Sequence, residues 1–156
     1  MASKSHVMIL IYLLASFFGI SCGATWIIFG FVDFELSGKI ALAGTMATTG
    51  LFHFIWTKGM ILMMPAFLPA KKMLVYITGI LEILVAPGLL IPVTTRITAI
   101  LLIIFLVLIL PSNIEGARKK VNLSKGDFTG PGLNYLWQRI PIQLVLIGWT
   151  YWFCLR

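Results

Sequence analysis

The sequence contains uninterrupted apolar runs that are long enough to cross a lipid bilayer. The first, Val7–Val32, holds 26 residues without a charge, whereas a helix needs about 20 apolar residues to span the hydrocarbon core. Of the 156 residues, 60% are apolar and only 11% are charged. Soluble domains carry about 25% charged residues, and a soluble chain this short could not bury so much apolar surface. The sequence therefore predicts an all-α integral membrane protein.

Five apolar segments follow one another, and each is predicted to form one transmembrane helix of a bundle. The second segment is rich in small residues: Ala43 and Ala47 lie four residues apart. Gly44 and Thr48 repeat the same spacing one position later, and such spacing lets helix backbones approach closely in lipid. The five segments are Val7–Phe31, Leu36–Trp56, Met73–Ile91, Thr95–Pro111 and Leu133–Leu155.

The stretch between the second and third segments differs from the spans. Residues 57–72, "TKGMILMMPAFLPAKK", are apolar but contain Pro65 and Pro69. Proline removes a backbone hydrogen bond and interrupts a helix, so no long helix fits here. We predict an interfacial or re-entrant cap at this point rather than a sixth span.

The first segment is predicted to be an additional helix, residues 1–35, in front of a four-helix membrane domain, residues 36–156. A signal peptide has an apolar core of about 7–15 residues, which is much shorter than the first run. The tetrapeptide "GISC", which ends at Cys22, leaves lipidation as the alternative to a retained helix.

The basic residues are distributed unequally between the two sides that five spans would define. Nine of the 12 Lys and Arg fall on the side of the amino terminus, and basic loops stay in the cytoplasm. We therefore predict a cytoplasmic amino terminus. The net charge of +7 is explained by this bias, and no nucleic-acid partner is expected. The nine are Lys4, Lys58, Lys71, Lys72, Arg118, Lys119, Lys120, Lys125 and Arg139.

One carboxylate lies inside an otherwise uncharged apolar stretch. Glu82 is the only charged residue of "YITGILEILVAPGLLIP", residues 76–92, and a charge within the membrane is costly unless it has a partner or a function. Hairpin connectivity would bring polar side chains from four helices into the same half of the membrane. This candidate ligand-binding set is His53, Glu82, Asn113, Arg139 and Gln143.

Three interpretations of this polar set remain open. It is a structural network that fixes the register of the helices, a polar pocket for the head of a small lipophilic molecule, or a proton relay. In each of them, Arg139 or His53 could neutralise Glu82 across the interior of the bundle. We predict no catalytic residue and no metal site, because no Cys-x-x-Cys pair is present.

Several blocks of the sequence resemble the DoxX family of small bacterial membrane proteins. The blocks are "GLFHF", "MILMMPAFLP", "LVYITGILEILVAPGLLIPVTTR", "PSNIEGA" and "LWQRIPIQLVLIGWTYW", within residues 40–153. The resemblance implies a four-helix membrane bundle in the bacterial inner membrane, with the first segment as an addition. The positions that match the family pattern are His53, Pro65, Glu82, Arg96, Asn113 and Arg139.

This resemblance also implies a functional context. The family takes its name from a subunit of a thiosulfate:quinone oxidoreductase, and other members are linked to membrane redox or stress complexes. We expect an accessory subunit that anchors or stabilises a larger complex, with a quinone or lipid as its ligand. Its partners would be membrane lipids and other subunits or a second copy. The alternatives are a quinone-linked oxidoreductase subunit that uses His53, Glu82 and Arg139, and a transporter of small solutes or protons.

The predicted topology can be tested by cysteine labelling. In a variant that lacks Cys22 and Cys154, the change Ser124→Cys places one thiol in the loop before the last segment. Because that loop is predicted to be cytoplasmic, an impermeant maleimide should label the thiol only after the cells are broken. Labelling of intact cells would show that this loop is outside the cytoplasm and that the predicted orientation is wrong.

Overall fold

A computed structural model describes residues 4–156 of the chain. Within them the regular structure is helical, apart from an isolated β-bridge between Asn122 and Asp127, which confirms the all-α prediction. The first three residues of the predicted cytoplasmic terminus lie outside the described residues. The elements are α1 (Lys4–Phe29), α2 (Phe34–Ile55), α3 (Thr57–Met63), α4 (Lys71–Leu90), α5 (Pro92–Leu108), α6 (Leu110–Arg118), the short 3-10 helix η1 (Gly132–Tyr135) and α7 (Leu136–Cys154).

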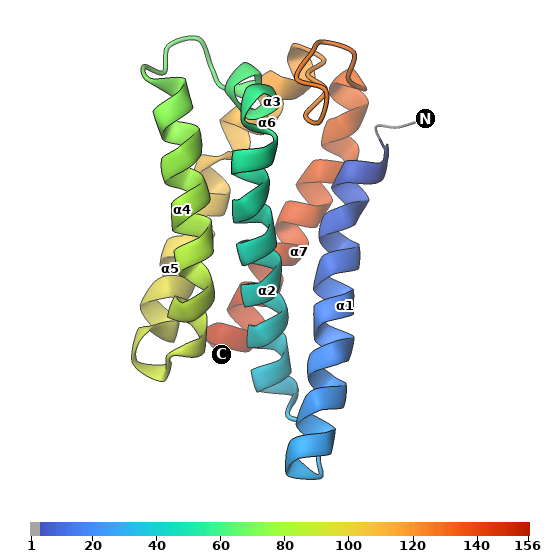
Figure 1. Ribbon diagram of the computed structural model, residues 1–156, viewed down its shortest axis with the longest axis vertical. Coiled ribbons are helices and arrows are strands. Elements are labelled where there is room, and N and C mark those ends of the chain that lie inside the picture. The colour runs from blue at the N-terminus through green and yellow to red at the C-terminus, as the bar shows by residue number, and fades with distance from the viewer. Residues whose placement is uncertain (1–3) are drawn as a thin grey trace.

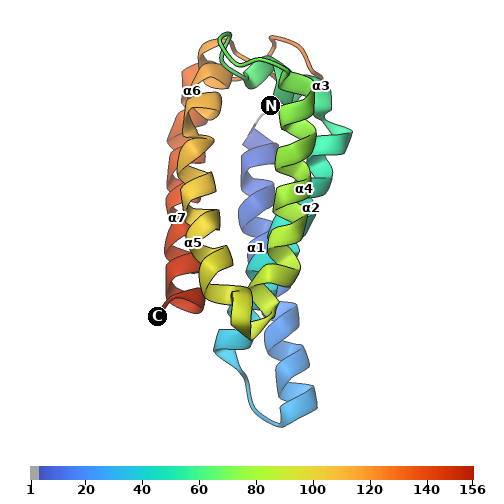
Figure 2. The ribbon, with the colours of Figure 1, turned by 90° about the vertical axis from the view of Figure 1, so that its left-hand side faces the viewer.

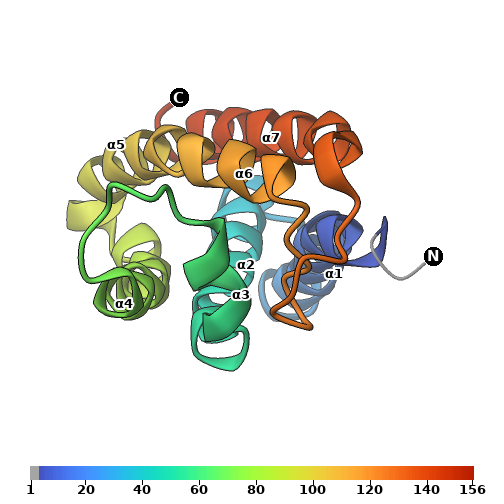
Figure 3. The same ribbon diagram turned by 90° about the horizontal axis from the view of Figure 1, so that it is seen from above.

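The long helices lie lengthwise in a bundle and alternate in direction, as Figure 1 and Figure 2 show. Viewed from above, α4, α2 and α1 form one row, and α5, α6 and α7 lie behind them (Figure 3). The amino terminus, α3, α6 and the loop before α7 are at one end of the bundle (Figure 1). The α1–α2 turn, the α4–α5 turn and the carboxyl terminus point toward the other. This alternation is the connectivity that the predicted polar set requires.

Several of these helices are suited to cross a membrane. Among the described residues, Met8–Phe29, Lys71–Leu90 and Pro92–Arg118 are long and apolar enough, and α2 with α3 qualifies if the bent pair is one span. The bend between α2 and α3 is 91°. Three or four helices of spanning length make this a membrane protein by composition. At the predicted cap, a seven-residue helix is followed by a non-helical link to α4.

The packing of α2 against α4 depends on two glycines that face each other. A methyl group added at Gly79 would lie 2.6 Å from the Cβ of His53, and one added at Gly50 would lie 2.8 Å from the carbonyl oxygen of Gly79. Both distances are shorter than a van der Waals contact, so the two backbones touch only because neither residue has a side chain. This contact positions His53 beside α4.

Other small residues of α2 contact other helices. The ring of Phe17 in α1 lies against Gly44, and the ring of Phe153 in α7 lies against Gly38. The indole nitrogen of Trp149 donates a hydrogen bond of 3.0 Å to the carbonyl oxygen of Gly38. The small residues predicted to allow close packing therefore include Gly44, whose partner is an aromatic ring of α1. As a result, α2 contacts α1, α4 and α7.

The turn between α4 and α5 satisfies its own backbone groups. The hydroxyl of Thr94 donates to the carbonyl of Gly88, and that of Thr95 donates to the carbonyl of Leu89, each over 2.9 Å. Carbonyls at a helix end otherwise lack partners. The sequence predicts that this helix starts at Thr95, but it begins at Pro92, because the fixed φ of proline suits the first helical position.

The close contact between α2 and α4 can be tested with two matched glycine variants. Gly79→Ala should destabilise the protein by about 1–3 kcal/mol, because the added methyl group has no room. Gly148→Ala is the control, since nothing lies within 4 Å of a methyl group there, and its effect should stay below about 1 kcal/mol. Thermal unfolding in detergent measures both, and equal midpoints for the two variants would contradict the close contact.

Candidate functional site

The polar site forms where α2 and α4 touch. His53, in the last turn of α2, faces Glu82, near the middle of α4, and its Nδ1 lies 3.8 Å from Oε2 of the carboxylate. The same nitrogen is 3.1 Å from the carbonyl oxygen of Thr49. With its proton on Nδ1, His53 donates a hydrogen bond to that carbonyl. The ring is therefore held one helical turn from Thr49 and beside the carboxylate.

The carboxylate of Glu82 is buried and incompletely partnered. Its side chain is 9% exposed, and Oε2 accepts no hydrogen bond from any residue that the structure describes. The distance of 3.8 Å to His53 is an ion-pair distance and too long for a hydrogen bond. Buried polar atoms of native proteins almost always have a partner, so this oxygen marks the position as a candidate binding site.

Glu82 lines a cavity of about 80 Å³. A single water molecule needs roughly 10–15 Å³ on this measure, whereas small-molecule sites typically measure about 300–1,000 Å³. The cavity therefore suits a head group or a few water-sized groups, but not a whole lipophilic molecule. Its polar lining is Thr49, His53, Trp56, Glu82 and Arg139, and its apolar lining includes Leu10, Met46, Met60, Leu106 and Leu146.

Glu82 also lines a second, larger space on the outer side of α4. This groove between α4 and α5 measures about 430 Å³, which is within the range of ligand sites. Apart from Glu82 and Thr98, its lining is apolar. Glu82 thus lines both a cavity with polar residues and an apolar groove. The apolar residues of the groove are Leu81, Leu84, Val85, Leu101, Leu102, Ile104, Phe105 and Leu108.

Arg139 shares the cavity without pairing directly with Glu82. It lies in the first turn of α7 and is half-buried. Among the described residues, the basic group within 4 Å of the Glu82 carboxylate is His53, and no ion pair joins Arg139 to it. The guanidinium therefore contributes a positive charge to the cavity rather than a bidentate contact.

The other two predicted residues contact each other instead of the cavity. Asn113 and Gln143 are both buried, and Nδ2 of Asn113 donates to Oε1 of Gln143 over 3.4 Å. Nε2 of Gln143 donates to the carbonyl of Leu106, which precedes the break between α5 and α6. This pair stabilises the broken helix and so has the role of a structural network.

Sequence reasoning missed Thr49 and Trp56 as lining residues. Thr49 precedes His53 by one helical turn, so the i, i+4 spacing placed it on the same face. Trp56 stacks on Phe52, with ring centroids 4.4 Å apart, and lies where α2 bends into α3. The threonine could have been found by spacing, but the tryptophan could not, because the bend brings it over the cavity. The described residues contain no cluster of three or more His, Cys, Asp or Glu that could hold a metal ion.

Comparison with known proteins places the chain in a family. Residues 42–154 match the model of a domain of unknown function, DUF8561. The chain belongs to this family. The matched stretch begins inside α2 and ends with α7, so it contains His53, Glu82 and Arg139 and leaves α1 outside. No curated protein and no solved structure shows significant similarity to the chain.

The geometry of the site predicts which pair of residues is energetically coupled. A double-mutant cycle of His53→Leu with Glu82→Gln should give a coupling energy of about 0.5–3 kcal/mol, because the two groups are in contact. The cycle of Arg139→Leu with Glu82→Gln should give a smaller value. Unfolding in detergent measures both cycles, and the larger coupling at Arg139 would show that the guanidinium is the true partner.

Proposed function

We propose that the protein is an accessory subunit of a membrane complex and holds an amphipathic lipophile, a quinone or a lipid, at Glu82. The observation that carries the proposal is that Glu82 borders both the polar cavity and the apolar groove between α4 and α5. A ligand with its head at the carboxylate and its tail in the groove would match both surfaces. The cavity has polar residues but is too small for a whole ligand, and the groove is large enough but almost wholly apolar.

The unpartnered carboxylate oxygen indicates the chemistry of the head group. An ionised carboxylate only accepts hydrogen bonds, so Oε2 of Glu82 would be satisfied by a hydroxyl or N–H group. Arg139 adds donors around the same cavity, and Nε2 of His53, with the proton on Nδ1, adds an acceptor. A head that carries both a donor and an acceptor, such as a hydroquinone or a lipid hydroxyl group, fits this set best. The ligand would enter from the bilayer, between α4 and α5.

The membrane arrangement that we propose has five spans. In addition to the spans described above, α7 has 19 residues and is about 28 Å long at 1.5 Å per residue, close to the thickness of about 30 Å of the hydrocarbon core. It packs lengthwise in the bundle (Figure 2). With most basic residues at the end of the amino terminus, that end would face the cytoplasm of a bacterial inner membrane.

Resemblance to the DoxX family supports the accessory role. It suggests a four-helix core formed by α2, α4, α5 and α7, with α1 as an addition, and an association with redox complexes. Partner subunits, or a second copy of the chain, would then contact the lipid-facing helices.

One observation favours a second candidate, a quinone-linked oxidoreductase subunit. His53 and Glu82 are 3.8 Å apart, so both could take up the two protons released when a hydroquinone is oxidised to a quinone. The two electrons would pass to an acceptor in a partner subunit. This candidate uses the same site and differs in requiring turnover of the ligand.

Binding of short-chain quinols tests the proposed site. In lipid nanodiscs, decylubiquinol should bind the wild-type protein and should bind Glu82→Gln about tenfold more weakly, because a hydrogen bond to a charged acceptor is lost. Glu115→Gln is the matched control, since Glu115 pairs with Lys119 over 3.1 Å and lies outside the cavity and the groove. Native mass spectrometry measures the bound fraction.

A groove-filling variant tests where the tail lies. Leu84→Trp should weaken binding of the same probe, because Leu84 lines the groove. Leu144→Trp, on a similarly exposed position of α7, should not. Unchanged binding to both Glu82→Gln and Leu84→Trp would contradict the proposed function.

A further inference from the structure

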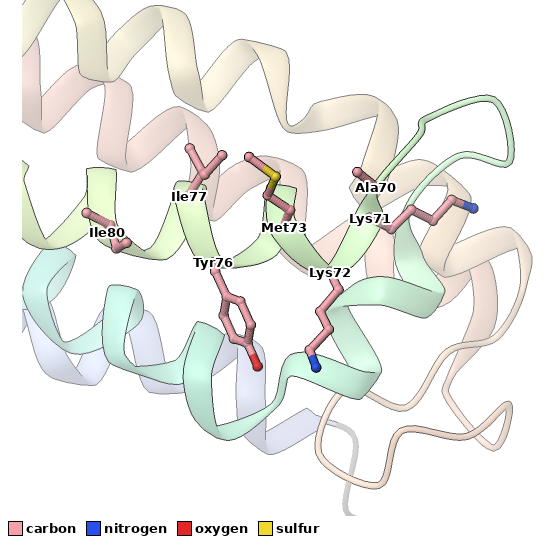
Figure 4. Close-up of a pocket in the computed structure, with 7 residues that line it drawn as sticks. All are labelled: Ala70, Lys71, Lys72, Met73, Tyr76, Ile77 and Ile80. Carbon is pink, nitrogen blue, oxygen red and sulfur yellow. The ribbon is translucent and has the colours of Figure 1, made fainter.

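A second groove lies on the outer face of α4, at the end of the bundle that holds α3. It measures about 530 Å³, and Lys71, Lys72 and Tyr76 line its upper part. Met73, Ile77 and Ile80 continue it along the helix at a spacing of three to four residues. Figure 4 shows the lysines at one end of this surface and the apolar side chains farther along it. The groove thus divides into a cationic end and an apolar track.

The ring of Tyr76 is held between two neighbours. It stacks on Phe54 of α2, with the ring centroids 5.6 Å apart and the planes at 10°. The ammonium group of Lys72 lies 5.9 Å from its centroid, within the range of a cation–π contact. In Figure 4 the Lys72 and Tyr76 side chains point the same way. A cationic group and a phenolic hydroxyl are therefore presented together at the end of the groove.

The cationic end has no acidic partner in the described part of the chain. Neither Lys71 nor Lys72 forms an ion pair there, whereas Glu115 is paired with Lys119. Other basic residues surround the same end of the bundle, among them Lys58, Arg118, Lys120 and Lys125. Positive charge without an acidic partner, at the end of a helix of membrane-spanning length, attracts an anion.

We infer that this groove binds an anionic phospholipid, with its phosphate at Lys72 and the Tyr76 hydroxyl, which point to the same side of α4, and with Lys71 beside the head group. Its acyl chain would lie along Met73, Ile77 and Ile80, all of which are exposed. The apolar track distinguishes a lipid from a free anion, since phosphate alone would leave that surface uncovered. Basic residues beside transmembrane helices bind such head groups through charge. The site is separate from the Glu82 groove, which none of these residues lines.

Competitive lipid retention tests the inference. The purified protein is exposed to equal amounts of dioleoyl phosphatidylglycerol and dioleoyl phosphatidylcholine, and native mass spectrometry counts each bound lipid. The wild-type protein should prefer phosphatidylglycerol, and the double variant Lys71→Gln/Lys72→Gln should lose at least about fivefold of that preference. Tyr76→Phe keeps the stacked ring and should lose a smaller part.

A charge-matched control separates the groove from general attraction. Arg118→Gln/Lys125→Gln removes two exposed positive charges from the same end of the bundle and should leave the preference unchanged. An equal loss in both double variants, or no preference in the wild-type protein, would overturn the inference. Displacement of the lipid by inorganic phosphate would do so too, because it would assign the site to a free anion. Unchanged thermal unfolding of the variants would show that they remain folded.

Discussion

The close approach of α2 and α4 is the contact on which the site depends. Gly50 and Gly79 let the two backbones touch, and His53 then lies against the next turn of α4. Without this approach, Glu82 would lack its nearest basic neighbour at 3.8 Å. A buried carboxylate in an apolar bundle needs such compensation. Two residues without side chains thus make a polar interior possible.

The position of Glu82 connects the interior of the bundle with its lipid-facing surface. Glu82 lines the cavity that His53 and Arg139 share, and it also lines the groove between α4 and α5. Asn113 and Gln143, by contrast, satisfy each other and the carbonyl of Leu106. The predicted polar residues therefore divide into three that line the cavity and a pair that contact each other. The pair has the contacts of a structural network, and the pocket interpretation of the other three stays a prediction.

Much of the helical architecture could be predicted from the sequence, because apolar length and proline position are local properties. The sequence predicts no long helix in the proline-containing stretch after Trp56, and the structure has a seven-residue helix there that is bent by 91° from α2. The start of α5 was misplaced by a few residues, since Pro92 begins the helix rather than preceding it. The distance of each polar residue from the end of its helix could also be predicted by counting residues. His53, Glu82 and Arg139 are therefore expected in the same half of the bundle.

The sequence by itself determined that the chain is helical and apolar, with most of its basic residues at one end, because these properties follow from composition and order. Only the tertiary structure decided which polar groups meet. The bend after α2 brings Trp56 to the cavity, and the rotation of each helix about its axis separates Asn113 and Gln143 from it. That rotation is set by packing, such as Gly79 against His53 and Gly44 against Phe17, and no local pattern specifies it. Glu82 therefore lines both the cavity and the groove only when α4 is packed against α2 and α5.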